Sequence, residues 1–326
     1  MTNAYKAHNL LQRLYHYILQ HTEAGIEAKE YLKKRGINDE TIKNFNIGFC
    51  PMKKSLTSEF LTNKGFDSEE LLNNNILEKS KSGKPYSLFK NRITFPIQDS
   101  AKQTIAFGGR TIDPNNKVKY LNSSESSIFK KENNLFGLNQ AKSSIENEGY
   151  AILFEGYFDV LKAHQNNIQN GLASLGTSLT HNQALLIKSI TNNIVIAYDG
   201  DNAGRENSFR SASVLNKIGC NVHVAEIKGG QDPDEYISEN GSVSFLSNII
   251  KQSKNVKLSL LDYKKQEYNL NKDTDRYDYA EEILNSVLKG EQNNKEDTKA
   301  ILKKLENEMD ISFNTMQEEI KNHFNQ

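Results

Sequence analysis

Four short apolar runs alternate with segments of helical periodicity in the middle of this chain. The runs occupy residues 150–154, 171–175, 194–198 and 222–227. Helical patterns follow the first three runs, at about 157–166, 180–190 and 203–218. Strands that alternate with helices form right-handed βαβ units, whose strands pair in parallel. The sequence therefore predicts an α/β unit with a parallel sheet and flanking helices.

Acidic residues follow three of these four predicted strands. Glu155 comes directly after the first strand, Asp199 and Asp201 after the third, and Asp232 and Asp234 after the fourth. Because the carboxyl ends of parallel strands meet at one edge of a sheet, we expect these carboxylates to lie close together. Like charges repel each other unless divalent cations hold them, and Mg²⁺ takes oxygen ligands and commonly brings phosphates. The pattern predicts metal-dependent phosphoryl or nucleotidyl transfer.

Several common site motifs are missing from the sequence. There is no GxGxxG, no GxxxxGK[ST] and no HExxH, which excludes a dinucleotide fold, a P-loop and a zincin. Cys50 and Cys220 are the only cysteines, so we expect no disulfide, no zinc in this chain and a reducing, cytoplasmic location. Because no apolar run approaches the roughly 20 residues of a membrane span, we expect no membrane partner.

The two halves of the chain differ in charge and in pattern. Residues 1–145 carry 22 Lys and Arg against 14 Asp and Glu, whereas residues 146–326 carry 19 against 27. This asymmetry is typical of nucleic-acid contact by the basic half, although a lysine-rich solvated surface explains it equally well. Helical spacing covers 4–22 and 27–35, β-rich runs at 94–97 and 104–107 predict a hairpin, and 113–131 is predicted to be a loop. Beyond Ser242 we expect only helices, over 243–269, 273–289 and 295–323.

Longer strings make the interpretation specific. The segments EGYFDVLKAHQNNIQNGLASLGTSLT, NIVIAYDGDNAGR and GGQDPDE resemble the toprim domain of bacterial replicative primases, the DnaG family. The segments RITFPIQDSAKQTIAFGGR and KYLNSSESSIFKKENNLFGL resemble the basic N-terminal subdomain of the same catalytic core. The resemblance covers roughly residues 5–245. It implies a mixed α+β basic subdomain at 1–148, a toprim domain with a parallel sheet at 149–242, and a helical subdomain at 243–326.

The resemblance also assigns roles to the acidic residues. It implies that Glu155 and Asp199 share one catalytic metal ion, and that Asp199 and Asp201 hold a second. Asp232 and Asp234 would complete the metal-binding patch. The resemblance implies supporting roles for Gly156, Gly200 and Asp159. We expect Gly200 to let the backbone turn so that both neighbouring carboxylates face one ion. Asp159 could equally cap the helix that follows it or pair with Lys162.

Four basic residues match the family's motif positions in the N-terminal half, namely Arg92, Arg110, Lys119 and Lys131. Such side chains near a metal site hold triphosphate oxygens or template phosphates. One departure weakens the basic cluster near Lys131, because Glu132-Asn133 stands where the family often has Gly-Arg, and Lys130 compensates only in part.

The function implied is DNA-templated synthesis of short RNA primers from NTPs by two-metal nucleotidyl transfer at replication forks. Mg²⁺ is the expected cofactor, and Mn²⁺ could replace it. The expected partners are single-stranded DNA template, NTPs, the RNA primer product and a replicative helicase that binds through a module absent here. Guanosine tetra- and pentaphosphate are expected inhibitors, because they carry phosphate arms and a base like that of GTP.

Two other functions stay open from the sequence. A different toprim enzyme, such as a topoisomerase or nuclease subunit, would share the acidic strand ends but not the N-terminal resemblance. A non-catalytic replication scaffold would have lost metal-site carboxylates, whereas all of them are present here. No zinc-ribbon pattern precedes the core and the chain ends before a helicase-binding module, so we expect an RNA polymerase core, excised or naturally short.

Overall fold

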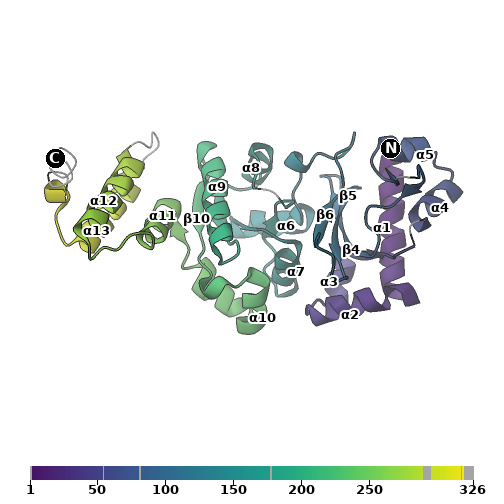
Figure 1. Ribbon diagram of the computed structural model, residues 1–326, viewed down its shortest axis with the longest axis horizontal. Helices are drawn as coiled ribbons and strands as arrows, with labels where there is room; N and C mark the ends of the chain where they lie inside the picture. The colour runs from purple at the N-terminus through teal and green to yellow at the C-terminus, as the bar shows by residue number, and fades with distance from the viewer. Residues whose placement is uncertain are drawn as a thin grey trace. The chain divides into compact units, whose positions relative to one another are not determined.

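The computed structural model describes residues 2–53, 55–80, 82–176, 178–288, 295–316 and 318 (Figure 1). The chain forms two compact units. The first contains residues 1–221 and 225–252, and the second contains residues 222–224 and 253–326. All the candidate site residues belong to the first unit.

The N-terminal part of the first unit is built on a four-stranded antiparallel sheet. Its strands lie in the order β1 (Gly48–Cys50), β4 (Arg92–Gln98), β5 (Thr104–Thr111) and β6 (Tyr120–Asn122), and β2 (Glu78–Lys79) pairs separately with β3 (Pro85–Tyr86). The helices are α1 (Asn3–His21), α2 (Ile26–Lys34), α3 (Asp39–Asn44), α4 (Leu56–Asn63) and α5 (Ser68–Asn73), with single turns η1 (Glu23–Gly25) and η2 (Lys131–Asn133).

Helix α1 owes its position to one apolar face. Leu11, Tyr15, Ile18 and Leu19 recur at helical spacing and are all buried. This face packs on β1 and β5, and the buried Tyr15 hydroxyl is 2.9 Å from Thr57 Oγ1. The expected helix over 4–22 is therefore confirmed. The Tyr15 hydroxyl, although buried in this packing, has a hydrogen-bond partner.

The expected hairpin is also confirmed, and it is longer than predicted. Its strands pair from Arg92 opposite Thr111 to Gln98 opposite Thr104. In the turn, Asp99 Oδ1 accepts the backbone N–H groups of Ala101 and Gln103, at 2.9 and 3.0 Å. Such side-chain acceptance is what makes Asp a turn residue.

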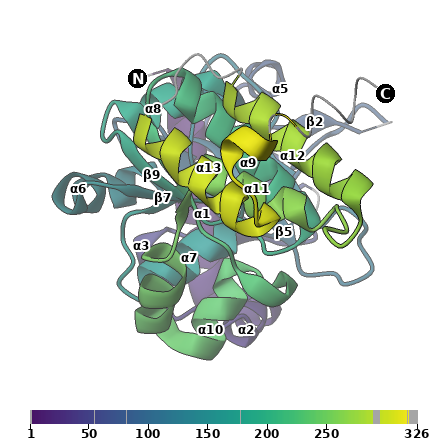
Figure 2. The ribbon, with the colours of Figure 1, turned by 90° about the vertical axis from the view of Figure 1, so that its left-hand side faces the viewer.

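The second part of the first unit carries the parallel strands. The elements are α6 (Leu138–Glu148), β7 (Ala151–Phe154), α7 (Tyr157–Gln165), β8 (Gly171–Ala173), α8 (His181–Lys188), β9 (Asn193–Ile196), α9 (Asn202–Lys217), η3 (Lys228–Gly230), α10 (Pro233–Ser244) and the π-helical turn η4 (Phe245–Ile250). Strand β7 is central and pairs in parallel with β8 and with β9. Helices α8 and α9 lie on one side of these strands, and α7 and α10 lie on the other (Figure 2).

One hydrophobic core joins the antiparallel and parallel parts of the first unit. The ring of Phe95 on β4 stacks on Tyr157 of α7, with centroids 4.8 Å apart, and Phe136 meets the Tyr157 ring edge-on. A Cβ atom at Gly108 of β5 would lie 2.3 Å from the Tyr157 hydroxyl oxygen, so only glycine fits there. This packing fixes the antiparallel sheet against the helix that follows β7.

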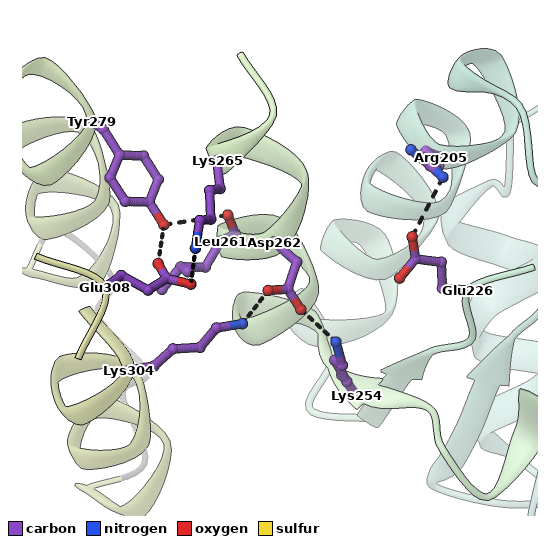
Figure 3. A network of polar contacts seen from close by, with 9 residues as sticks. All are labelled: Arg205, Glu226, Lys254, Leu261, Asp262, Lys265, Tyr279, Lys304 and Glu308. Carbon is purple, nitrogen blue, oxygen red and sulfur yellow. Dashed lines mark hydrogen bonds and ion pairs between the residues drawn. The ribbon is translucent and has the colours of Figure 1, made fainter. Parts of the chain in front are cut away.

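The second unit is mainly helical. Strand β11 (Lys254–Asn255) pairs antiparallel with β10 (Asn221–Val224), and helices α11 (Val256–Lys265), α12 (Asp273–Leu288) and α13 (Lys295–Met309) follow. Leu261, Tyr279 and Leu305 are buried in its core. Figure 3 shows its polar contacts: Asp262 accepts from Lys254 and Lys304, and the Tyr279 hydroxyl donates to Glu308 at 2.8 Å.

Some predictions about elements were wrong. The structure contains a strand beyond Ser242, because β11 and η4 interrupt the helix expected over 243–269. Strand β6 lies inside the expected loop 113–131. Both strands are only two or three residues long and leave no periodic pattern in the sequence. Helix α13 ends at Met309, before Asp310 with its positive φ of 54°. Residues 289, 317 and 319–323 of the expected helices lie outside the described residues.

Within the part of the chain that the structure describes, no helix combines the length and the apolar character needed to cross a membrane.

Candidate active site

Glu155 follows the fully buried strand β7 and lies deep at the strand end. Its Oε1 atom is buried and has no hydrogen-bond partner among the described residues. Burial raises the pKa of this carboxyl, and the negative charges of Asp201 and Asp232 raise it further. Asn207 and the Asp199 backbone oppose this shift through hydrogen bonds. An orphaned buried carboxylate oxygen is costly unless a ligand binds it, which makes this atom a candidate metal ligand.

Asp199 follows β9 and is the most perturbed carboxyl of the group. Its pKa is raised to about 8, first by burial and then by the negative charges of Asp159, Asp232, Glu155 and Asp201. These mutual interactions show that the acidic residues predicted from three separate strands do come together in the fold. Repulsion of this kind is relieved by bound cations.

The loop between Asp199 and Asp201 is held against the segment that precedes α10. Gly200 N donates to the carbonyl of Gln231 at 3.0 Å, and a Cβ atom at Gly200 would lie 2.2 Å from the carbonyl oxygen of Ile227. Gly200 does not have a positive φ, so glycine is required by this close backbone approach and not by the turn we predicted. Asp201 caps α9, accepting the Gly204 N–H at 2.7 Å.

The two carboxylates of the DPD string have different surroundings. Asp232 is the N-cap of α10, and its pKa is raised by burial and by Glu235 and Asp234. Asp234 is buried and forms a 2.6 Å ion pair with Arg35. Asp232 forms no ion pair with a described residue, whereas Asp234 already has a positive partner.

Asp159 holds two loops together. Its Oδ2 accepts the Gly156 N–H at 2.9 Å, and its Oδ1 accepts the Asp234 N–H at 3.2 Å. Burial and the charge of Asp234 raise its pKa to about 7. Of the two open roles, helix capping is confirmed and pairing with Lys162 is wrong, because Lys162 Nζ donates to the carbonyls of Arg35 and Gly36.

The acidic residues are close enough to repel, but they are not a closed ligand shell. Among the described residues, no three His, Cys, Asp or Glu side chains are placed to hold one metal ion together. The unpartnered oxygen of Glu155 and the raised pKa of Asp199 nevertheless fit oxygen-ligated cations.

A pocket of about 270 Å³ opens beside Glu155. Its other lining residues are Ser174, Gly176, Ser178, Tyr198 and Asn207. We did not predict Ser174, Tyr198 or Asn207 from the sequence, since such isolated residues carry no periodic or motif signal. Hydroxyl and amide groups beside a carboxylate are suited to the ribose and phosphate oxygens of a nucleotide.

Arg92 and Arg110 lie on neighbouring strands with different exposure. Arg92 is buried and donates to the carbonyls of Val118 and Lys119, at 2.8 and 3.0 Å. Burial and the Arg110 charge lower its pKa. Arg110 is partly exposed, and its guanidinium lies 4.7 Å from the centre of the Tyr120 ring. Arg92 therefore supports the segment that carries Lys119, while Arg110 can reach a ligand.

Lys119 is exposed and Lys131 is partly exposed. Neither ammonium group has an ion pair or hydrogen bond to another described residue, so both are available to phosphates. Lys130, which we expected to reinforce Lys131, is instead paired with Glu125 at 3.2 Å.

Arg35 is the residue that we missed. Besides the Asp234 ion pair, its guanidinium lies 4.7 Å from the centre of the Phe158 ring. It follows Lys33 and Lys34 in a basic run at the end of α2, and nothing in that run distinguishes it. Only the fold brings α2 to the acidic loops.

The raised pKa values predict how pH affects the metal-free protein. The ordinary Asp pKa is 3.8, whereas the pKa in the folded protein is about 7 for Asp159 and about 8 for Asp199. At pH values between these limits, the native state keeps protons that the unfolded state has released. Stability without metal should therefore fall as pH rises from about 4 to about 8. Melting curves in EDTA should show this fall, which Asp199→Asn reduces. Replacement of exposed Glu146 by Gln is the control, and an identical pH profile for the parent and Asp199→Asn would contradict the prediction.

The acidic strand ends and the basic antiparallel sheet, joined through one core, define a toprim-type catalytic core. Two family models match the chain: the N-terminal domain of the DNA primase catalytic core over residues 14–142, and a toprim-like domain over residues 152–237. The DNA primase of Halalkalibacterium halodurans is 40% identical over 278 residues, which cover 85% of this chain and 46% of that protein.

Two solved structures are similar over nearly the whole chain. The Aquifex aeolicus primase structure with zinc-binding and RNA polymerase domains is 32% identical, with a TM-score of 0.75, and the match covers 96% of this chain and 74% of that one. A DnaG primase catalytic domain bound to single-stranded DNA is 28% identical, with a TM-score of 0.77 and coverage of 94% and 96%. The chain belongs to the DnaG family of DNA primases. It spans about half the length of the full DNA primases that it matches.

Proposed function

We propose that this chain is a primase catalytic core that copies single-stranded DNA into short RNA primers from NTPs. The observation that carries the proposal is the convergence of Glu155, Asp199, Asp201 and Asp232 at the ends of β7, β9 and the segment before α10, beside a pocket of about 270 Å³. Clustered carboxylates with raised pKa values in a cleft are typical of functional sites.

The metal ions are assigned to the same carboxylates. Glu155 and Asp199 would hold one Mg²⁺ or Mn²⁺ ion, and Asp199 with Asp201 a second, with Asp232 close by. Bound divalent ions supply activation of the attacking 3′-hydroxyl and stabilisation of the leaving pyrophosphate. Asp234 contributes mainly through its ion pair with Arg35, which fixes the start of α10.

The protein's own contribution is positioning. Asp159 joins the β7–α7 loop to the start of α10 by two hydrogen bonds, so the carboxylates on those loops keep their spacing. Arg110, Lys119 and Lys131 would hold template or triphosphate oxygens, and Arg92 would hold the Lys119 segment in place.

The direct test is incorporation of labelled NTPs on single-stranded DNA with Mg²⁺ or Mn²⁺, with EDTA as the negative control. Metal-dependent, template-dependent RNA synthesis is expected. DNA binding without incorporation under any metal condition would favour the scaffold role. Relaxation or cleavage of supercoiled DNA without RNA synthesis would favour another toprim enzyme.

Further partners follow from the same proposal. A related DnaG catalytic domain has been solved with single-stranded DNA, which supports that template here.

Guanosine tetra- and pentaphosphate should compete with initiating NTPs, because the same cations would hold their phosphates. Inhibition that persists unchanged at saturating NTP would assign these inhibitors to a separate site. We also propose a replicative helicase as partner and the cytoplasmic replication fork as location for the protein that carries this core.

The basic residues give a separate prediction. Arg110→Ala and Lys119→Ala should each weaken binding of single-stranded DNA, because each removes a cation that binds phosphate. The slope of log affinity against log salt should become shallower by about 0.7 for each such cation removed. Fluorescence anisotropy over a salt series measures both effects. Lys142→Ala, which removes an exposed lysine of α6, is the matched control. Unaltered affinity and slope in both variants would mean that this surface does not bind the template.

A further inference from the structure

A large pocket lies at the other end of the antiparallel sheet, away from the acidic site. It has a volume of about 650 Å³ and lies between α1, the end of α4 and the β4–β5 turn. Four cationic side chains line it, namely Lys6, Arg13, Lys64 and Lys102. No Asp or Glu is among its described lining residues, which otherwise are amides and the apolar Leu10 and Phe66.

These four cations come from three separate segments. Lys6 and Arg13 are seven residues apart on α1, so they share one face of the helix. Lys64 is the C-cap of α4, and Lys102 belongs to the hairpin turn. The fold therefore gathers positive charge that no single run of sequence contains.

None of the four cations is neutralised within the part of the chain that the structure describes. No ion pair or hydrogen bond joins any of their charged groups to a described residue; Lys64 alone has an aromatic contact, 5.9 Å from the Phe60 ring centre. Elsewhere in the same unit, Arg35 and Arg205 each have a carboxylate partner. Unpaired like charges around a concavity repel each other unless an anion lies between them.

Lys102 gives an independent indication. Its φ is 60°, in the left-handed region that favours Gly or Asn over a long side chain. Its backbone N–H is bonded to the Asp99 carbonyl at 3.0 Å, so the turn itself needs this conformation but not this side chain. A lysine at such a position is a local cost to the fold, and the side chain faces the pocket.

The pocket is separate from the acidic site. None of the described residues that line it also lines the pocket beside Glu155, and Gln98, at the pocket, is six positions from Arg92 at the far end of β4. At about 3.3 Å per residue this is roughly 20 Å. A ligand in this pocket would therefore bind at a different place from a substrate beside Glu155.

We propose that this pocket, lined by Lys6, Arg13, Lys64 and Lys102, is a second binding site for a phosphorylated ligand. The chemistry required is phosphate oxygen, which ammonium and guanidinium groups bind well. Two sources supply it: a free nucleoside triphosphate, or the backbone of a nucleic-acid strand. Leu10 and Phe66 give either one an apolar surface for a base or sugar.

Lysine footprinting of the full chain tests the proposal. The amines are acylated in EDTA, which removes metal-dependent binding at the acidic site, and mass spectrometry measures each lysine. The probes are ATP and an oligothymidylate of about sixteen nucleotides. We expect saturating probe to reduce acylation of Lys6, Lys64 and Lys102 about fivefold or more, as phosphate contacts shield the amines. Lys43 and Lys142, which are exposed and lie outside the pocket, should not change.

The two probes distinguish the sources of phosphate. Protection by ATP alone identifies a free nucleotide site, and protection by the oligonucleotide identifies a strand-backbone site. The absence of protection by both probes, or equal protection of Lys43 and Lys142, would overturn the proposal.

A variant separates binding from folding. Lys102→Gly removes the amine and also relieves the strained φ, so the melting temperature should stay the same or rise. The same variant should weaken binding of the protecting probe about threefold or more, because one phosphate-binding amine is gone. The double variant Lys64→Glu/Lys102→Gly should abolish the protection of Lys6, whereas Lys43→Glu/Lys142→Glu should retain it. Full protection of Lys6 in the pocket variant would show that these cations do not form one site.

Discussion

Asp199→Asn is expected to reduce primer synthesis about 100-fold or more without destabilising the metal-free protein. The substitution keeps the shape of the side chain but removes the carboxylate that we assign to both metal ions. It also removes repulsion, since burial and the negative charges of four neighbouring carboxylates raise the pKa of Asp199 to about 8. Initial rates of NTP incorporation and melting curves in EDTA measure the two effects.

A second active-site variant and a surface control complete this experiment. Glu155→Gln should lose activity to a similar degree, because its buried Oε1 has no other ligand among the described residues. Glu146→Gln changes an exposed carboxylate on α6 and should leave both quantities unaltered. Primer synthesis close to that of the parent in Asp199→Asn would remove the basis of the metal assignment.

Gly200→Ala is expected to have the second-largest effect, and it acts on structure and activity together. The added Cβ would lie 2.2 Å from the Ile227 carbonyl oxygen, a backbone atom that cannot rotate away. The loop must shift, which should cost about 1–3 kcal/mol of unfolding free energy and displace Asp199 and Asp201. Urea denaturation and primer synthesis should both report the change.

Gly229→Ala is the matched control, since it lies in the segment that Gly200 approaches. A Cβ there meets nothing within 4 Å, although its φ of 81° is strained for alanine. We expect a stability cost of about 1 kcal/mol and nearly full activity. If Gly200→Ala were no more harmful than Gly229→Ala, the close backbone approach would not be what requires glycine.

Strong local patterns made the central fold predictable. Apolar runs that end in Glu155 and Asp199 indicated parallel strands with acidic carboxyl ends, and β7 and β9 are where we expected them. The hairpin around Asp99 was predictable for a similar reason, because the turn residue and the flanking β-rich runs lie close together in sequence.

Contacts between distant segments were not predictable. The Arg35–Asp234 ion pair joins residues 199 positions apart, and the Asp159–Asp234 hydrogen bond joins residues 75 apart. We interpreted Gly200 as a turn residue because its neighbours suggested one, whereas the close approach of the Ile227 backbone is the physical reason. Burial and neighbouring charge, which shift the carboxyl pKa values, are likewise properties of the assembled site.

The sequence by itself determined the alternation of strands and helices in the parallel part, the positions of Glu155 and Asp199 shortly after β7 and β9, and the resemblance to the DnaG family. These depend on periodicity and motif, which are local. The tertiary structure decided which carboxylate stays free and which is paired, why Arg92 is buried while Arg110 is available, and that four scattered cations surround one pocket. These depend on distances between segments that are far apart in the chain, and only packing sets those distances.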